Sequence, residues 1–193
     1  MPVSWRHGFD ECGKDGRPLL SWRVVILPFL EQSELYAEFH LDESWDSPHN
    51  QRLSKKMPRT YAAVAGRDAV APDSTFYQVF TGDGTSFETN GLVMPKDFPD
   101  GLANTILVVE AGHAVPWTKP ADLLYLSERP LPELGGLFKG PTRFSNWNQI
   151  PGMNVAFADG SVQFLRRPIQ EEILRGMITR NGGEPVSREN RMD

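Results

Sequence analysis

The four histidines are the residues whose chemistry would most readily define an active site, and their spacing gives them no common site. His7, His40, His49 and His113 are scattered along the chain, with no pair four residues apart and no HExxH pattern. A zinc site needs several ligands at short, regular spacing, so this pattern gives a zinc centre little support. Asp46 could orient His49 as a base, but both residues lie in a helix-start turn, where capping is the better interpretation.

The other patterns that resemble catalytic motifs are better explained as turns and loops. Residues 82–86 lack the lysine and the full spacing of a phosphate-binding loop. The chain has no G-x-S-x-G elbow on which a hydrolase triad could be built. Its single cysteine, Cys12, lies in a polar, glycine-rich start, where an incidental thiol is expected. The sequence therefore predicts that the protein is not an enzyme, and it names no catalytic residue.

Three acidic residues leave a metal-binding alternative open. Glu88, Asp97 and Asp100 could contribute to a loop calcium site, because carboxylates on irregular backbone suit that ion. Acidic surface loops are the commoner explanation for such residues. No cofactor is predicted beyond this calcium alternative.

Two tryptophans in loops leave a ligand-binding alternative open. Trp117 and Trp147 lie in segments with little periodicity and, together with Lys119, could contact a ligand. Residues 117–140 are rich in proline and glycine and are long for a structureless connection, which usually indicates function or mobility.

Composition excludes several classes of protein. The chain has 193 residues and a formal net charge of −5, whereas a dedicated nucleic-acid binder usually shows a basic stripe. A single cysteine cannot form an internal disulfide, and no apolar run approaches the roughly 18–20 residues that span a bilayer. With 16 prolines and 17 glycines, the sequence predicts a loop-rich fold with short strands rather than a helical bundle.

The first third of the chain predicts short helices. Apolar residues recur at helical spacing through residues 19–39, with Ser21 as the N-cap and Pro28 dividing the helix. A second helix start is predicted at Ser47, which can cap, and at Pro48, which suits the first helical position.

The rest of the chain predicts a mainly antiparallel sheet and a final helix. Residues 75–80 and 104–110 are strand candidates, and the second is apolar enough to be covered on both faces. Residues 154–165 predict a hairpin with Asp159-Gly160 as a two-residue turn. That register places four apolar side chains on one face: Val155, Phe157, Val162 and Phe164. Pro168 opens a helix whose apolar stripe is Ile169, Ile173, Leu174, Met177 and Ile178. The predicted fold class is α+β.

Several blocks in order resemble one bacterial family. They are residues 15–24, 26–32 and 45–50, and further along residues 100–101, 104–107, 110–111, 116–120, 134–136 and 154–162. Together they resemble the domain of unknown function 1559 family, which is abundant in planctomycetes and is often described as pilin-like, with a prepilin-type processing-associated domain. The resemblance implies a single pseudopilin-like head at residues 15–184, between a poorly ordered start at 1–14 and a tail at 185–193.

The chain departs from the family pattern in two places. The family has a histidine followed, after nine residues, by Asp-Gly; Asp159 and Gly160 match, but Gln149 occupies the histidine position. A glutamine can hydrogen-bond but does not titrate near neutral pH, so any metal or acid–base role of that histidine loses its key group. Family members usually begin with a prepilin-like leader and a long apolar helix, which this sequence does not show. A truncated or misplaced reading frame is the favoured interpretation, and a leaderless version is the alternative.

The resemblance implies a non-enzymatic envelope or secretion-associated structural protein. Its expected partners are copies of itself or a secretion or pilus machinery, with no nucleic acid, and with membrane contact only through the anchor helix. If the full-length protein has the family leader, the resemblance implies a location outside the cytoplasm; the chain as given would be soluble and cytoplasmic. The alternative function is an extracytoplasmic, solute-binding-like module that uses residues 117–140.

Overall fold

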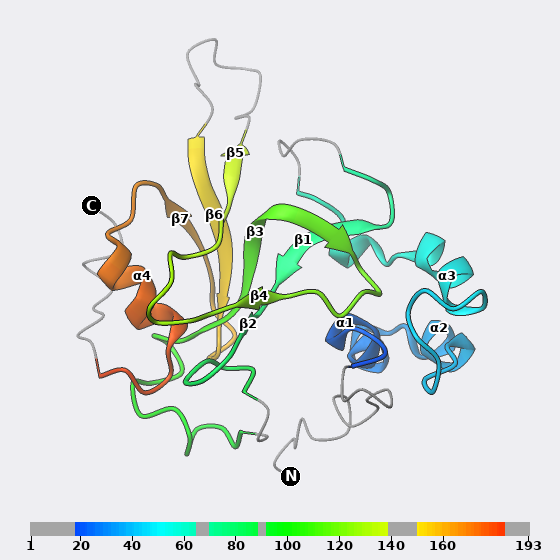
Figure 1. The fold of residues 1–193 in the computed structure, drawn as a ribbon, viewed down its shortest axis with the longest axis horizontal. Coiled ribbons are helices and arrows are strands. Elements are labelled where there is room, and N and C mark those ends of the chain that lie inside the picture. Colours follow the sequence, from blue (N-terminus) through cyan, green and yellow to red (C-terminus); the bar gives the residue numbers. More distant parts are fainter. Residues whose placement is uncertain (1–17, 65–69, 89–91, 139–149, 184–193) are drawn as a thin grey trace.

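A central sheet with helices at both ends forms the molecule (Figure 1). The computed structural model describes residues 18–64, 70–88, 92–138 and 150–183. Helices α1, α2 and α3 lie together at one end of the sheet, and α4 lies at the other. This arrangement confirms the predicted α+β class. The predicted start at 1–14 and tail at 185–193 lie outside the described residues.

Six short helical segments build the helical lobe, the part of the chain from residue 20 to 61. They are α1 (Trp22–Val25), η2 (Leu27–Leu30), α2 (Ser33–Glu38), α3 (Asn50–Leu53), η3 (Ser54–Lys56) and η4 (Arg59–Tyr61). The Ser21 hydroxyl accepts a hydrogen bond from the Arg23 backbone N–H, which confirms the predicted N-cap. Pro28 lies in the first turn of η2, where the helix divides as expected. The Ser47 hydroxyl accepts from the Asn50 N–H, but α3 begins at Asn50 with His49 as its N-cap, so the predicted helix start at Ser47 and Pro48 is placed too early.

Five antiparallel strands form the main sheet. They are β1 (Ser74–Gln78), β3 (Ile106–Pro116), β5 (Gly136–Phe138), β6 (Ile150–Phe157) and β7 (Val162–Arg166). The order is β1-β3-β6-β5, and β7 pairs with β6. A smaller parallel pair joins β2 (Phe80–Thr81) to β4 (Leu123–Leu124). The segment 117–140, expected to lack regular structure, therefore supplies two short strands, β4 and β5.

The predicted hairpin forms, but its register is shifted by one residue. Phe157 and Ser161 close the hairpin, with the Phe157 N–H donating to the Ser161 carbonyl, so the loop has three residues and not two. Gly160 alone takes the left-handed conformation, at φ 84°. A shift of one residue turns every side chain of a strand to the opposite face. Val162 and Phe164 are therefore 68% and 39% exposed, and the four-residue apolar face that we predicted is wrong.

Replacing Gly160 with valine is expected to destabilise the protein by about 1–2 kcal/mol. The cost arises from the positive φ, which a β-branched residue adopts poorly, because no neighbouring atom lies within 4 Å of the position. Gly160→Asn is the matched control, since asparagine tolerates this conformation better. Urea unfolding of the three proteins measures the effect. Equal midpoints for the wild type and the valine variant would contradict it.

Two hydrophobic clusters hold the fold together. The sheet cluster packs α4 (Glu171–Ile178) against the sheet, and Met177 and Ile178 are fully buried in it. Ile173 and Leu174 pack against the same cluster, which confirms the predicted stripe from Ile173 onward. Ile169 packs there too, but the helix begins at Glu171 and not at Pro168 as predicted. The lobe cluster fills the helical lobe with apolar side chains: Leu20, Val24, Leu27, Leu35, Phe39, Leu53, Tyr61 and Trp117. Within the part of the chain that the structure describes, no helix has both the length and the apolar character needed to cross a bilayer.

Candidate functional site

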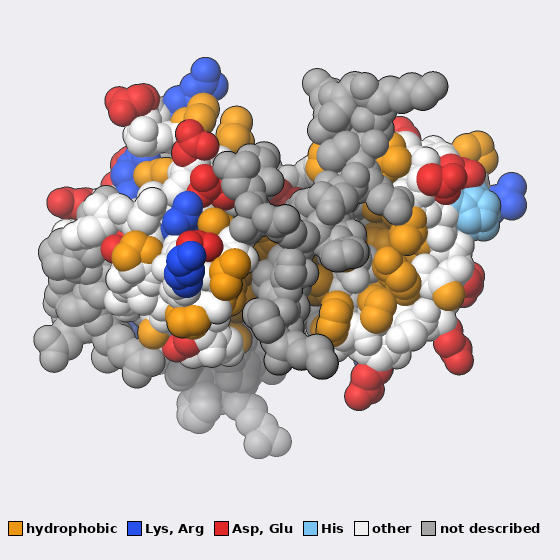
Figure 2. Space-filling model, turned by 90° about the horizontal axis from the view of Figure 1, so that it is seen from below, with side chains coloured by type: hydrophobic (Ala, Val, Ile, Leu, Met, Phe, Trp, Pro, Cys, Tyr) orange, Lys and Arg blue, Asp and Glu red, His pale blue; other side chains and the backbone are white. Residues whose placement is uncertain are grey.

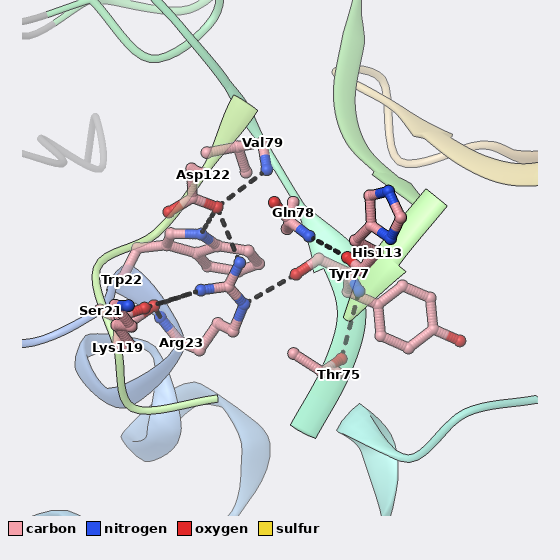
Figure 3. Close-up of polar contacts among 10 residues, drawn as sticks. All are labelled: Ser21, Trp22, Arg23, Thr75, Tyr77, Gln78, Val79, His113, Lys119 and Asp122. Carbon is pink, nitrogen blue, oxygen red and sulfur yellow. Dashed lines mark hydrogen bonds and ion pairs between the residues drawn. The ribbon is translucent and has the colours of Figure 1, made fainter. Parts of the chain in front are cut away.

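The most concentrated set of polar contacts joins α1 to the sheet and centres on Arg23 (Figure 3). The Arg23 side chain is fully buried, and each of its guanidinium nitrogens has an acceptor. Nη2 forms an ion pair with Asp122 Oδ1 at 2.7 Å, and Nε donates to the Tyr77 carbonyl at 2.7 Å. Nη1 donates to the Ser21 hydroxyl at 2.6 Å and approaches the Lys119 carbonyl at 3.5 Å. One cation therefore ties α1 to β1 and to the segment after β3.

Asp122 collects donors from the same two parts of the molecule. Its Oδ1 accepts from the Trp22 indole N–H and from the Val79 backbone N–H, both at 3.1 Å, in addition to Arg23. The Trp22 ring lies beside the guanidinium, with the Arg23 Cζ 4.9 Å from the ring centre. The carboxylate thus connects the helical lobe with the stretch that follows β1.

The charges of this pair are stabilised by each other against a large loss of hydration. Burial raises the pKa of the Asp122 carboxyl, although the nearby Arg23 guanidinium opposes the shift. Burial also lowers the pKa of the Arg23 guanidinium, against the attraction of Asp122. Removing one partner from such a pair leaves an uncompensated buried charge, which costs far more than an exposed ion pair contributes. The Arg23–Asp122 pair, called the clamp below, therefore holds α1 against the sheet.

Trp117, predicted to contact a ligand from an open loop, is instead at the centre of the lobe cluster. Its side chain is fully buried, and the indole N–H donates to the Ser54 carbonyl at 2.7 Å. The ring packs edge-on against Phe39 and stacks with Tyr61, both with ring centres 5.8 Å apart. This corrects the prediction: Trp117 follows directly on β3, which carries it into the core where no ligand reaches it.

The other predicted site residues that the structure describes do not gather with Trp117 in a cleft. Lys119 places its ammonium 5.3 Å from the Trp45 ring centre, so it lies on the lobe beside the clamp. Asp159 and Gly160 form the hairpin loop, where an Asp159 carboxylate oxygen accepts from the Ser161 backbone and hydroxyl. Trp147 and Gln149 lie outside the described residues.

Of the three acidic residues considered for calcium, Glu88 pairs with an arginine and the other two bind backbone N–H groups. Glu88 forms an ion pair with Arg180, whose Nη1 donates to the Asp97 carbonyl. The Asp97 carboxylate accepts from the Val93 N–H, and the Asp100 carboxylate accepts from the Gly183 N–H. Over the described ranges, no group of three or more metal-ligating side chains gathers at one point. Arg180 therefore neutralises the Glu88 carboxylate, whereas the Asp97 and Asp100 carboxylates accept from backbone N–H groups.

A pocket of about 350 Å³ lies elsewhere, between the stretch before β5 and the start of α4. Its lining is Pro130, Leu131, Pro132, Glu133, Leu134, Met153, Arg167, Ile169, Glu171 and Leu174. Leu134 and Met153 are buried apolar side chains, and Arg167 Nη1 donates to the Leu134 carbonyl at 3.0 Å. The volume is near the lower end of small-molecule sites. Part of the 117–140 segment therefore borders a cavity, although neither Trp117 nor Lys119 does.

Sequence reasoning missed the clamp and most of the pocket lining. Phe29 is one of the apolar residues at helical spacing in residues 19–39, yet its side chain is 75% exposed, whereas Arg23 is buried. The block that contains Ser21, Trp22 and Arg23 carries part of the family resemblance, and this is the signal in the sequence that points to the clamp. Nothing in the sequence around Asp122 marks it as the partner, because the two residues are 99 positions apart.

Comparison with known proteins gives one family match, and it covers the segment that builds the helical lobe. Neither the curated proteins nor the solved structures include a match to the chain. The matched segment ends before the first strand of the sheet, so it contains Arg23 but not Asp122 or Trp117. Residues 1–66 match the family described as "Protein of unknown function (DUF1559)", which confirms the family resemblance drawn from the sequence.

Proposed function

We propose that the protein is a non-enzymatic, pilin- or pseudopilin-like structural protein of the cell envelope or of a secretion apparatus. The observation that carries this proposal is that polar residues of the family blocks make internal contacts. Asn50 is an example: it is fully buried, and its Nδ2 donates to the carbonyls of His40, Glu43 and Ser44 at 2.9–3.2 Å. Arg23 is likewise fully buried and makes all of its polar contacts inside the molecule. Residues that build a scaffold in this manner suit a structural role.

Three buried titratable groups with shifted pKa values also favour a scaffold over an enzyme. A catalytic group combines a shifted pKa with access to a substrate. Burial raises the pKa of the Tyr61 phenol, but its hydroxyl donates to the Arg23 carbonyl inside the lobe. Arg23 and Asp122 are fixed by each other. None of these three residues lines the 350 Å³ pocket.

Exposed apolar surface supports contact with other proteins. Figure 2 shows apolar side chains gathered on the side of the molecule that holds α1–α3, with charged side chains around their rim and on the rest of this face. On η2, Phe29 is 75% exposed. Extended apolar surface on a protein usually marks an interaction site.

The proposal is tested by locating the protein in its own cells. A tagged copy expressed from its own gene is expected to fractionate with the envelope or the extracellular material and to give higher-order species on chemical cross-linking. Sequencing the N-terminal peptide of the purified native protein tests for the anchor helix. Recovery of all the protein as an uncross-linked species in the cytosolic fraction would refute the proposal.

The pocket favours a second candidate, a ligand-binding module. Filling the cavity by Leu174→Trp is expected to abolish co-purification of any small molecule detected by native mass spectrometry. Leu124→Trp is the matched control, because Leu124 is exposed and does not line the pocket. If no small molecule accompanies the wild-type protein purified from its own cells, or if one persists in the Leu174 variant, this candidate fails.

A further inference from the structure

The two outer strands of the sheet, β1 and β7, differ in whether their outward-facing backbone groups are bound by side chains. On β1, the edge is occupied by the clamp: Arg23 Nε donates to the Tyr77 carbonyl at 2.7 Å, and Asp122 accepts from the Val79 N–H just beyond the strand. A side chain that binds the free groups of an edge prevents another strand from pairing there. The β1 edge is therefore closed by this chain's own residues.

Among the residues that the structure describes, none caps the β7 edge in this way. The Phe157 N–H donates to the Ser161 carbonyl, and the Arg167 N–H donates to the Pro151 carbonyl, so odd-numbered residues of β7 direct their backbone groups toward β6. In an antiparallel pair the alternate residues direct theirs away from the partner. Val162, Phe164 and Arg166 therefore point their N–H and C=O groups outward, and these groups have no partner among the described residues.

Two of these outward-facing positions also carry exposed apolar side chains, which favour contact with another strand. Val162 is 68% exposed and Phe164 is 39% exposed, although both are apolar. Phe164 lies against the Phe138 ring, with ring centres 5.1 Å apart, and a Cβ on Gly152 would meet it at 2.5 Å. The aromatic ring is thus supported from its own sheet and is in place before any partner arrives. An open edge of this kind is a template for strand addition.

We propose that a second copy of this chain pairs antiparallel with β7, which joins the two sheets across this edge. The strand begins close to Asp159 in the hairpin loop and ends in Arg166. An antiparallel copy sets the basic end of each strand beside the acidic start of the other, whereas a parallel copy would bring like charges together. With the two-fold axis at Phe164, that residue faces Phe164 of the second copy, and Val162 faces Arg166 of the second copy. The inference names the surface for the assembly role proposed above and rests on that role.

Sedimentation of the full chain over a range of concentrations tests the proposal. The wild-type protein is expected to show a dimer, and Val162→Lys to raise its dissociation constant at least about tenfold, because two Lys–Arg pairs of like charge would oppose each other. Leu137→Lys is the matched control, since Leu137 is similarly exposed at 49% but lies on β5. The double variant Val162→Lys/Arg166→Glu is expected to recover the dimer through two new ion pairs.

Each outcome decides for or against the proposal. A monomeric wild type, equal weakening by the two lysine variants, or a double variant as weak as Val162→Lys would overturn it. If Val162→Lys fails to fold by circular dichroism, Phe164→Cys in a Cys12→Ser background decides: a disulfide-linked dimer supports the two-fold axis, and its absence refutes it. Envelope location is measured separately, so a failed dimer test leaves that result unaffected.

Discussion

Replacing Asp122 with alanine is expected to lower the free energy of unfolding by about 3–5 kcal/mol. The substitution leaves the fully buried Arg23 guanidinium without its charged partner, and it removes the acceptor of the Trp22 indole N–H and the Val79 N–H. Denaturant unfolding followed by circular dichroism measures the loss. An effect under 1 kcal/mol would show that the pair does not clamp the lobe to the sheet.

Two controls separate the buried charge from the ion pair as such. The double variant Arg23→Met/Asp122→Leu removes both charges and is expected to be more stable than Asp122→Ala, because apolar replacements of a buried pair are often neutral or stabilising. Glu38→Ala breaks the exposed pair with Lys56 and is expected to cost at most about 1 kcal/mol. If the double variant were the least stable of the three, the electrostatic account would be wrong.

Trp117→Ala is expected to cost about 3–5 kcal/mol, because it empties the centre of the lobe cluster. The indole contacts Phe39 and Tyr61, and its N–H satisfies the Ser54 carbonyl, so both packing and a buried hydrogen bond are lost. Trp117→Phe keeps most of the packing but leaves that carbonyl without its donor, and a smaller loss of about 1–3 kcal/mol is expected.

Urea unfolding monitored by circular dichroism measures both Trp117 variants. Phe29→Ala is the control: the side chain is 75% exposed, so its removal is expected to change stability by no more than about 0.5 kcal/mol. If Trp117→Ala resembled this control, Trp117 would not anchor the lobe.

Local signals predicted local structure well. Ser21 caps α1, and Pro28 lies at the break between α1 and η2. Both effects could be predicted because they depend on residues within one helical turn. The sequence predicts the hairpin correctly but places its pairing register one residue off. Asp-Gly suits both a two-residue turn and a three-residue loop with glycine in the left-handed position. The choice of loop is made by side chains far along the two strands: Met153 and Leu165 are buried opposite each other, and no short-range pattern fixes that.

Contacts between distant segments could not be predicted from one sequence. Trp117 was assigned to an open loop because prolines and glycines follow it, but its position is set by Ser54 and Tyr61, more than fifty residues earlier. The role of Asp122 as the partner of Arg23 likewise depends on the chain folding back against α1. The pocket likewise forms between two segments, residues 130–134 and residues 167–174, whose proximity depends on the whole sheet.

The placement of Trp117 has a consequence for how this architecture can diverge. The helical lobe is encoded almost continuously, yet its central ring and the counter-ion of its buried arginine are encoded much later, after β3. A gene fragment that ends with the lobe would encode the lobe helices without Trp117 at their centre and without Asp122, the partner of Arg23. In homologues, insertions between the lobe and β3 are expected to be tolerated, whereas the tryptophan and the carboxylate should be inherited together with the arginine.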